Sequence, residues 1–289
     1  MLEFHRETKV LGCPSHSHIC GNLHRDSPVL ESMKYFPCLG FLSVGLISIG
    51  CRFGHHLGSS LTVSHDKDGY TIESGSGPIV KGSGKIVTKE YSLGDFSRLD
   101  INSPAEVVVS EGQPSVKLTI DDNLVSAFDV EVRGGQLVLM SDKSMSMKEM
   151  PKLVITTKDL SECAVGSATK IDIRGGTAKK FTVDANGAAV VTLIGTFDDL
   201  NFELNGASRA TVTGATNKLT VDNSGASSID LSGLTAKDGD IEANGASKVT
   251  ANVTNQLKAS ASGASTIWYT VEPKSLVQDV SGASKVIKK

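Results

Sequence analysis

The chain has 289 residues, with 29 lysines and arginines against 32 aspartates and glutamates, and a formal net charge of −3. This balance lacks the positive excess that a phosphate backbone attracts, so it argues against nucleic-acid binding. All seven histidines lie within the first 65 residues, which leaves the rest of the chain without imidazole for general-base catalysis or zinc ligation. We therefore expect no cofactor and no enzymatic activity.

Residues 1–32 show no apolar periodicity, and we interpret them as an extension that results from a mis-assigned start, with Met33 as the true initiator. Residues 33–51 have the layout of an export signal. Lys34 supplies a positive charge, an apolar run follows, and Cys51 comes after a small residue. The apolar run is shorter than the roughly 20 residues that a transmembrane helix needs.

Residues 48–51 resemble the end of a bacterial lipoprotein signal, in which the cysteine becomes the lipidated N-terminus. The resemblance implies lipid attachment at Cys51, export, and anchorage to a membrane at the outer membrane, the cell surface or the periplasm. An ordinary signal peptide or an uncleaved anchor is the alternative, because leucine is usual where Ser48 stands.

Residues 52–85 are rich in glycine, serine and histidine and poor in apolar residues. That composition predicts a flexible tether. The segment 86–93 is a candidate first strand of the following domain, which we expect to span residues 86–289.

Residues 96–160 contain alternating apolar segments punctuated by glycine and proline, which predicts strands. We expect them to form the first, wider coils of a stack and a hairpin that caps one end. The methionine-rich segment 145–150 is predicted to be an exposed loop, with a methionine-rich contact surface as the alternative. The lone Cys163 is expected to be a small buried residue rather than a reactive thiol.

From residue 186 onward a short motif, Asn/Ser-Gly-Ala-Ser/Ala, recurs six times at steps of 18 to 20 residues. Val165-Gly166-Ser167-Ala168 is interpreted as a degenerate earlier copy. Apolar residues alternate with polar ones on both sides of each motif, the mark of half-buried strands. Glycine is suited to the corners because the chain there must adopt positive φ or pass close to a neighbouring coil. The six corner glycines are Gly187, Gly206, Gly225, Gly245, Gly263 and Gly282.

This repeat predicts an all-β fold, a right-handed parallel β-helix or solenoid with coils of about 19 residues. A propeller would need a repeat of about 40 residues. In such a stack, residues at equivalent positions form columns about 4.8 Å apart. A second glycine in three repeats predicts a second corner; these are Gly195, Gly214 and Gly233.

One predicted outward column is acidic and lies three residues before the corner glycines. Its first four members are Asp184, Glu203, Asp222 and Glu242. These carboxylates are weak candidates for a divalent-cation ladder, whereas solvated surface charges are the simpler interpretation. Arg209, Lys248 and Lys285 form a partial basic column on the other side of the corner and are expected to neutralise part of the acidic one.

Residues 96–109, the segment 134–139 and the coils to Lys289 resemble the family of putative auto-transporter adhesins with a head GIN domain, found in Bacteroidetes lipoproteins. The resemblance implies a β-helix and brings no catalytic residues. We expect an envelope-anchored binding module for an extended ligand, a glycan or a protein. The alternatives are an envelope sensing domain that acts through a protein partner and, less favoured, a polysaccharide-active enzyme.

Overall fold

The computed structural model describes residues 47–49, 61–74 and 77–289, and its regular structure is almost all β, with 66% of residues in strands and 3% in helix. The one short helix among the described residues, η1 (Asp122–Ala127), is a 3-10 helix. The chain forms a β-solenoid of about seven turns, with parallel coils of about 19 residues. The all-β solenoid predicted from the repeat is therefore confirmed.

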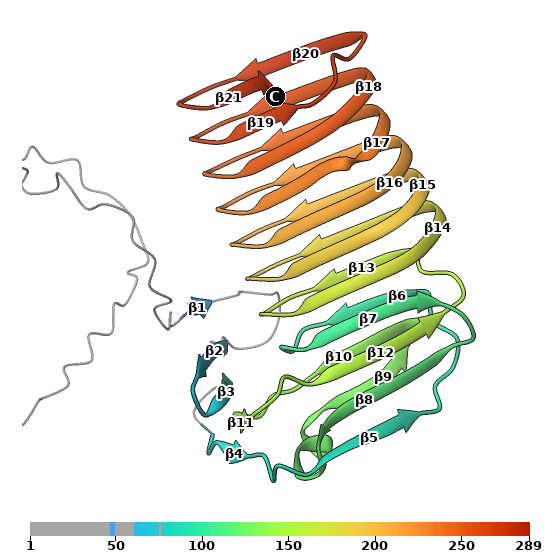
Figure 1. Ribbon diagram of the computed structural model, residues 1–289, viewed down its shortest axis with the longest axis vertical. Coiled ribbons are helices and arrows are strands. Elements are labelled where there is room, and N and C mark those ends of the chain that lie inside the picture. Colours follow the sequence, from blue (N-terminus) through green and yellow to red (C-terminus); the bar gives the residue numbers. More distant parts are fainter. Residues whose placement is uncertain (1–46, 50–60, 75–76) are drawn as a thin grey trace, which may run out of the picture. The chain divides into compact units, whose positions relative to one another are not determined.

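Long strands in the second half of the chain carry the repeat. Each strand pairs in parallel with the next, which stacks the coils in sequence order (Figure 1). Each corner motif lies between the end of one strand and the start of the next. The first half of each strand follows a corner and lies on one face of the stack. The second half precedes the next corner and lies on the other face. These strands are β14 (Lys170–Ala185), β15 (Val190–Leu204), β16 (Arg209–Asn223), β17 (Ser228–Ala243) and β18 (Lys248–Ala261).

We call these two surfaces the post-corner face and the pre-corner face. The second predicted corner does not interrupt the strands: Gly195 lies within β15 and Gly214 within β16. The chain turns there without losing its pairing, since Gly195 and Gly214 are partners in the ladder. The second predicted corner is therefore a bend within a continuous strand, because backbone pairing to the adjacent coil continues through it.

Shorter strands extend both faces toward the N-terminal end. The pre-corner face continues through β13 (Glu162–Val165), β6 (Arg98–Ile101) and β10 (Gln136–Met140). The post-corner face continues through β7 (Glu106–Glu111) and β12 (Lys152–Thr157). The coil formed by β6 and β7 comes first in sequence but lies between the β10–β12 coil and the β13–β14 coil.

Antiparallel strands close this end of the stack. On the pre-corner face β9 pairs antiparallel with β10, and on the post-corner face β8 pairs with β12 and β5 pairs with β8 (Figure 1). At the other end the last coils contribute three short strands. The bounds are β5 (Ile86–Tyr91), β8 (Ser115–Asp121), β9 (Asp129–Arg133), β19 (Thr266–Tyr269), β20 (Ser275–Val280) and β21 (Lys285–Lys288).

The core runs between the two faces and is filled by the inward member of each alternating pair. Phe202 and Leu204 are buried, whereas Glu203 between them is exposed. Phe181 and Phe197 lie in adjacent strands, with their ring centroids 5.2 Å apart. The inward register predicted from the period-two alternation is therefore confirmed at these positions.

A separate small sheet, four of whose five strands precede the solenoid in sequence, contradicts the prediction of a tether throughout 52–85. Leu61 and Val63 alternate with polar residues, and the hairpin turn is tightened by the Asp68 amide, which donates to Asp66 Oδ1 at 2.8 Å. Composition concealed this pattern because the apolar residues are few. The sheet order is β1 (Ile47–Ile49), β2 (Leu61–Asp66), β3 (Gly69–Ser74), β11 (Met145–Met147) and β4 (Val80–Lys81).

Strand β11 also corrects the prediction of an exposed methionine loop. Met145 and Met147 are 0% and 3% exposed, and β11 pairs antiparallel with β3 and parallel with β4. The two methionines are two residues apart, so both point to the same side of their strand and are buried together. Because their partner strands lie in the predicted tether, no pattern in the sequence indicates that these methionines are buried.

Candidate functional site

The repeating corner shapes the narrow edge of the solenoid. The six corner glycines have φ between 71° and 78°. A Cβ atom built on any of them would lie 2.6 to 2.9 Å from the carbonyl oxygen of the corner before it. Both the backbone conformation and the close approach of adjacent coils therefore require glycine at this position.

The earlier, degenerate copy of the motif is displaced by one residue from the predicted alignment. Asn186 N donates to Val165 O and Ala188 N donates to Ser167 O, so Ser167 occupies the place that Gly187 occupies one coil later. Ser167 has φ of 58°, which is uncommon for a residue with a side chain. Gly166 corresponds instead to the polar corner position of Asn186.

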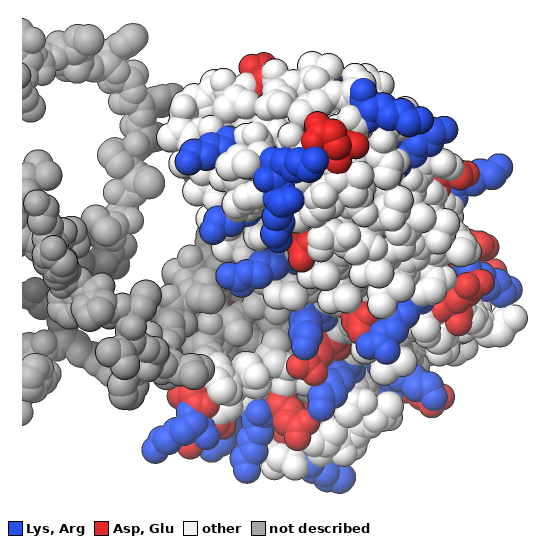
Figure 2. Space-filling view, turned by 45° about the horizontal axis from the view of Figure 1, so that its top comes forward, with Lys and Arg blue, Asp and Glu red and all other residues white. Residues whose placement is uncertain are grey.

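The predicted acidic column is present on the pre-corner face. Asp184 pairs in register with Glu203, Glu203 with Asp222, and Asp222 with Glu242. Figure 2 shows basic and acidic side chains interspersed over the visible surface, with uncharged surface between them. Because the four carboxylates are consecutive register partners, they form one line of negative charge along the stack.

Three of the four carboxylates of this column accept a hydrogen bond from the corner of their own coil. Asn186 Nδ2 donates to Asp184 Oδ1 at 2.5 Å, and Asn205 Nδ2 donates to Glu203 Oε1 at 3.2 Å. Ser224 Oγ makes the equivalent bond to Asp222 Oδ1 at 3.2 Å. Each donor lies two residues after its carboxylate, so the polar residue of the corner motif supplies a partner for the acid before it.

Asp100 is a further member of the column that the repeat did not reveal. It pairs in register with Ala164, which in turn pairs with Asp184, and Asn102 donates to its carboxylate. Its coil ends in Asn102-Ser103-Pro104-Ala105 and lacks the glycine on which the repeat was aligned. The signal available in the sequence was the Asp-x-Asn spacing shared with Asp184 and Asn186.

Partial burial, with a contribution from nearby like charges, raises the pKa of two of these groups. Partial burial raises the pKa of Asp184, and the nearby Glu203 carboxylate adds to this effect, while the bond from Asn186 opposes it. Partial burial likewise raises the pKa of Asp100, with a further contribution from Glu162. The column therefore holds its negative charge at some cost to the folded state.

The weak candidates for a cation ladder do not converge on a shared point. Within residues 47–49, 61–74 and 77–289, no three histidine, cysteine, aspartate or glutamate side chains are grouped closely enough to hold a metal ion. The expected neutralisation by Arg209, Lys248 and Lys285 is also not observed, since none of the salt bridges in that part of the chain joins them to an acid. The basic and acidic columns lie on different faces of the stack.

Cys163 lies in β13 and is fully buried. Burial, followed by the nearby Asp100, Asp184 and Glu162 carboxylates, raises the pKa of its thiol to about 12. A thiol in this state is almost entirely protonated near neutral pH, and the thiolate is the nucleophilic form. Cys163 therefore packs as a small apolar residue.

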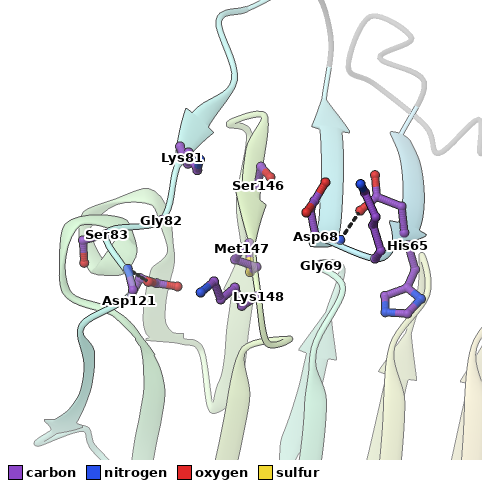
Figure 3. A pocket seen from close by; sticks show the side chains of 13 residues that line it. His65, Asp68, Gly69, Lys81, Gly82, Ser83, Asp121, Ser146, Met147 and Lys148 are labelled. Atoms are coloured by element: carbon purple, nitrogen blue, oxygen red, sulfur yellow. Dashed lines mark hydrogen bonds between the residues drawn. The ribbon is translucent and has the colours of Figure 1, made fainter.

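A pocket of about 1020 Å³ lies where the small sheet meets the antiparallel cap (Figure 3). Residues 65–69, 81–84 and 146–148 line it together with the buried Asp121. Asp121 Oδ1 accepts a hydrogen bond of 2.6 Å from the Gly84 amide, so this carboxylate fixes the loop beside it. The sequence pattern does not indicate this pocket, because nine of its thirteen lining residues fall in the predicted tether.

The remaining predicted site residue, Cys51, lies outside the described residues, as do residues 1–32 and all of the signal segment except Ile47–Ile49 in β1. In the part of the chain that the structure describes, no helix is both long and apolar enough to cross a bilayer.

A family model described as "Putative auto-transporter adhesin, head GIN domain" matches residues 95–273. A search of curated proteins gave no match. The match of the family model begins just before β6 and ends between β19 and β20, so it covers most of the solenoid.

Solved structures with the same fold come from Bacteroidetes. A putative adhesin from Bacteroides fragilis is 20% identical, with a TM-score of 0.68, over 73% of this chain and 100% of its own. A putative lipid binding protein from Parabacteroides distasonis is 17% identical, with a TM-score of 0.60, over 73% of this chain and 100% of its own. A putative adhesin from Parabacteroides merdae is 20% identical, with a TM-score of 0.60, over 73% of this chain and 98% of its own.

Proposed function

Because the chain belongs to the head GIN domain family of putative auto-transporter adhesins, we propose that it is a cell-envelope-anchored, non-catalytic module that binds an extended ligand. The observation that carries this proposal is the solenoid itself. Its coils stack in register from β14 to β18 and present two long faces. Faces of this kind suit ligands that are themselves repetitive, such as glycan chains or extended protein segments.

The chemistry of the described surface supports binding rather than catalysis. The carboxylates of Asp184, Glu203 and Asp222 accept hydrogen bonds from their own corners. The thiol of Cys163 is buried in the core. The three carboxylates are hydrogen-bonded within their own coils and the thiol is enclosed in the core, which favours recognition by the exposed side chains over chemistry at these groups.

Anchorage through a lipid on Cys51 is the second part of the proposal. Its support is the apolar run that ends at Gly50-Cys51. The anchor would hold the solenoid at the outer membrane, at the cell surface or in the periplasm. A polypeptide anchored in this way can present a rigid, elongated ligand-binding stack without spanning the bilayer.

The anchor is tested by cell fractionation of wild type and Cys51→Ala. We expect wild type in the detergent-extracted membrane fraction and Cys51→Ala in the soluble periplasm or medium. Ligand binding is tested separately by presenting the full chain to glycan arrays and to envelope proteins. Membrane retention of Cys51→Ala would contradict the anchor, and the absence of any saturable ligand would contradict the binding role.

A further inference from the structure

The post-corner face carries a row of cations at alternate coils. The outward position three residues after the corner holds a basic residue in one strand and a neutral residue in the next. Alternate strands in such a ladder are about 9.6 Å apart, twice the ordinary separation of paired strands. In register order the residues of this row are Lys170, Val190, Arg209, Ser228, Lys248, Thr266 and Lys285, and Glu106 of β7 lies beside Lys170 where the row begins.

The four basic residues of this row, which we call the cation row, are available to a ligand. Lys170, Arg209, Lys248 and Lys285 are all exposed. None of them takes part in a salt bridge within the described residues. This contrasts with the acidic column, where Asp184, Glu203 and Asp222 each have a donor in their own coil.

The cation row is a line rather than a broad positive field. The neighbouring outward column, two residues further along each strand, contains acids at Asp172 and Asp230 and threonines at Thr192 and Thr211 between them. A flat anionic lipid surface would favour positive charge spread across the face. A single row with neutral and acidic flanks instead matches an anionic ligand that is itself linear.

An aromatic side chain lies beside the row at its C-terminal end. Trp268, the one tryptophan of the chain, points outward and is partly exposed. It stands in register between Thr250 and Ile287, two residues after Thr266. Its strand is therefore the one between the strands that carry Lys248 and Lys285. Aromatic rings stack on the apolar faces of sugar rings, and tryptophan combines a large apolar surface with a polar N–H.

We infer that a linear anionic polysaccharide lies along the cation row, with its carboxylates against the four basic side chains and a sugar ring against Trp268. This step rests on the proposed function and names the ligand class. A polysaccharide of alternating acidic and neutral sugars carries one carboxylate in every second ring, as the row carries one cation in every second coil. In such a polymer each carboxylate can face one cation of the row, and like charges are not brought close together.

The test uses the full chain and hyaluronan, a linear polymer of alternating acidic and neutral sugars, with neutral dextran beside it. The cation row is neutralised in a variant that carries Lys170→Gln, Arg209→Gln, Lys248→Gln and Lys285→Gln. The matched control removes the same charge from exposed lysines elsewhere, through Lys179→Gln, Lys180→Gln, Lys218→Gln and Lys237→Gln. Thermal melting establishes that both variants are folded.

We expect wild type and the control variant to bind hyaluronan in a salt-dependent manner. The row variant should lose about tenfold or more in affinity, and Trp268→Ala should weaken binding with its salt dependence unchanged. Equal losses of affinity in the row variant and the control variant would overturn the inference. So would binding to phosphatidylglycerol vesicles without binding to hyaluronan. Binding to a neutral glycan or a protein alone would also overturn it, while leaving the proposed binding function intact.

Discussion

At the scale of single residues, the corner glycines meet two requirements at once. Gly206 has φ of 74°, and a Cβ atom on it would lie 2.6 Å from Gly187 O in the coil before it. Backbone amides of the corner bond across the same interval, since Ala207 N donates to Gly187 O at 2.7 Å. A side chain here would force adjacent coils apart at the point where they are bonded.

We therefore expect Gly206→Ala to lower the free energy of unfolding by about 1–3 kcal/mol from the strained backbone conformation, with a further loss from the displaced carbonyl. Urea denaturation of the full chain measures this. Gly94→Ala is the control, because no atom lies within 4 Å of its added Cβ and its φ is not positive. Similar losses in both variants would show that the corner does not depend on glycine.

The inward register makes a second prediction at this scale. Phe202 is 2% exposed, so Phe202→Ala should lower the free energy of unfolding by about 3–5 kcal/mol, the usual range for a buried phenylalanine. Glu203→Ala on the adjacent outward position should change it by no more than about 0.5 kcal/mol. The midpoints of denaturant unfolding compare the two, and comparable losses would contradict the assigned register.

At the scale of elements, the acidic column stores repulsion that the corner donors offset in part. Burial and the Glu203 carboxylate raise the pKa of Asp184 above its ordinary value of 3.8. A carboxyl with a raised pKa in the folded state favours unfolding once it is ionised in both states. This effect is present at neutral pH and disappears as the pH falls below 3.8, where the group is protonated in both states.

Asp184→Asn should therefore raise the unfolding free energy at pH 7, and the gain should shrink as the pH falls toward 3.8 and below. Thermal melting across this pH range measures the difference between variant and wild type. Asp199→Asn is the control, since its register neighbours are Lys180 and Lys218 and removal of its charge should not stabilise the fold. A gain for Asp184→Asn that persists at low pH would contradict the electrostatic cause.

Elements with a repeat were predictable, and elements that pair only with distant segments were not. The strands β14 to β18 follow from one alternation pattern anchored on the corner glycines. Strand β11, in contrast, is held by β3 and β4, and nothing in residues 145–147 indicates these partners. The second glycine predicts the bend at Gly195 but not the continuity of the strand, which is maintained by pairing to both adjacent coils.

At the scale of the whole molecule, the columns of charge and the pocket depend on the order in which the coils and strands pack. The acidic column could be read from the sequence through Asp184 to Glu242, because the register of the coils follows the corner spacing. Asp100 joins the column only through the coil of β6, whose position beside β13 is set by pairing rather than by spacing. The pocket beside Asp121 is lined by residues 65–69, 81–84 and 146–148, and no sequence pattern brings these segments together.

The central claim is that the solenoid binds an extended ligand and leaves it chemically unchanged. The most direct measurement incubates the full chain with the polysaccharides that bind it on a glycan array and then determines the chain length of the recovered polymer. We expect saturable binding with the polymer recovered at its original length. A polymer that is shortened during the incubation would contradict the non-catalytic role and would assign the solenoid a catalytic one.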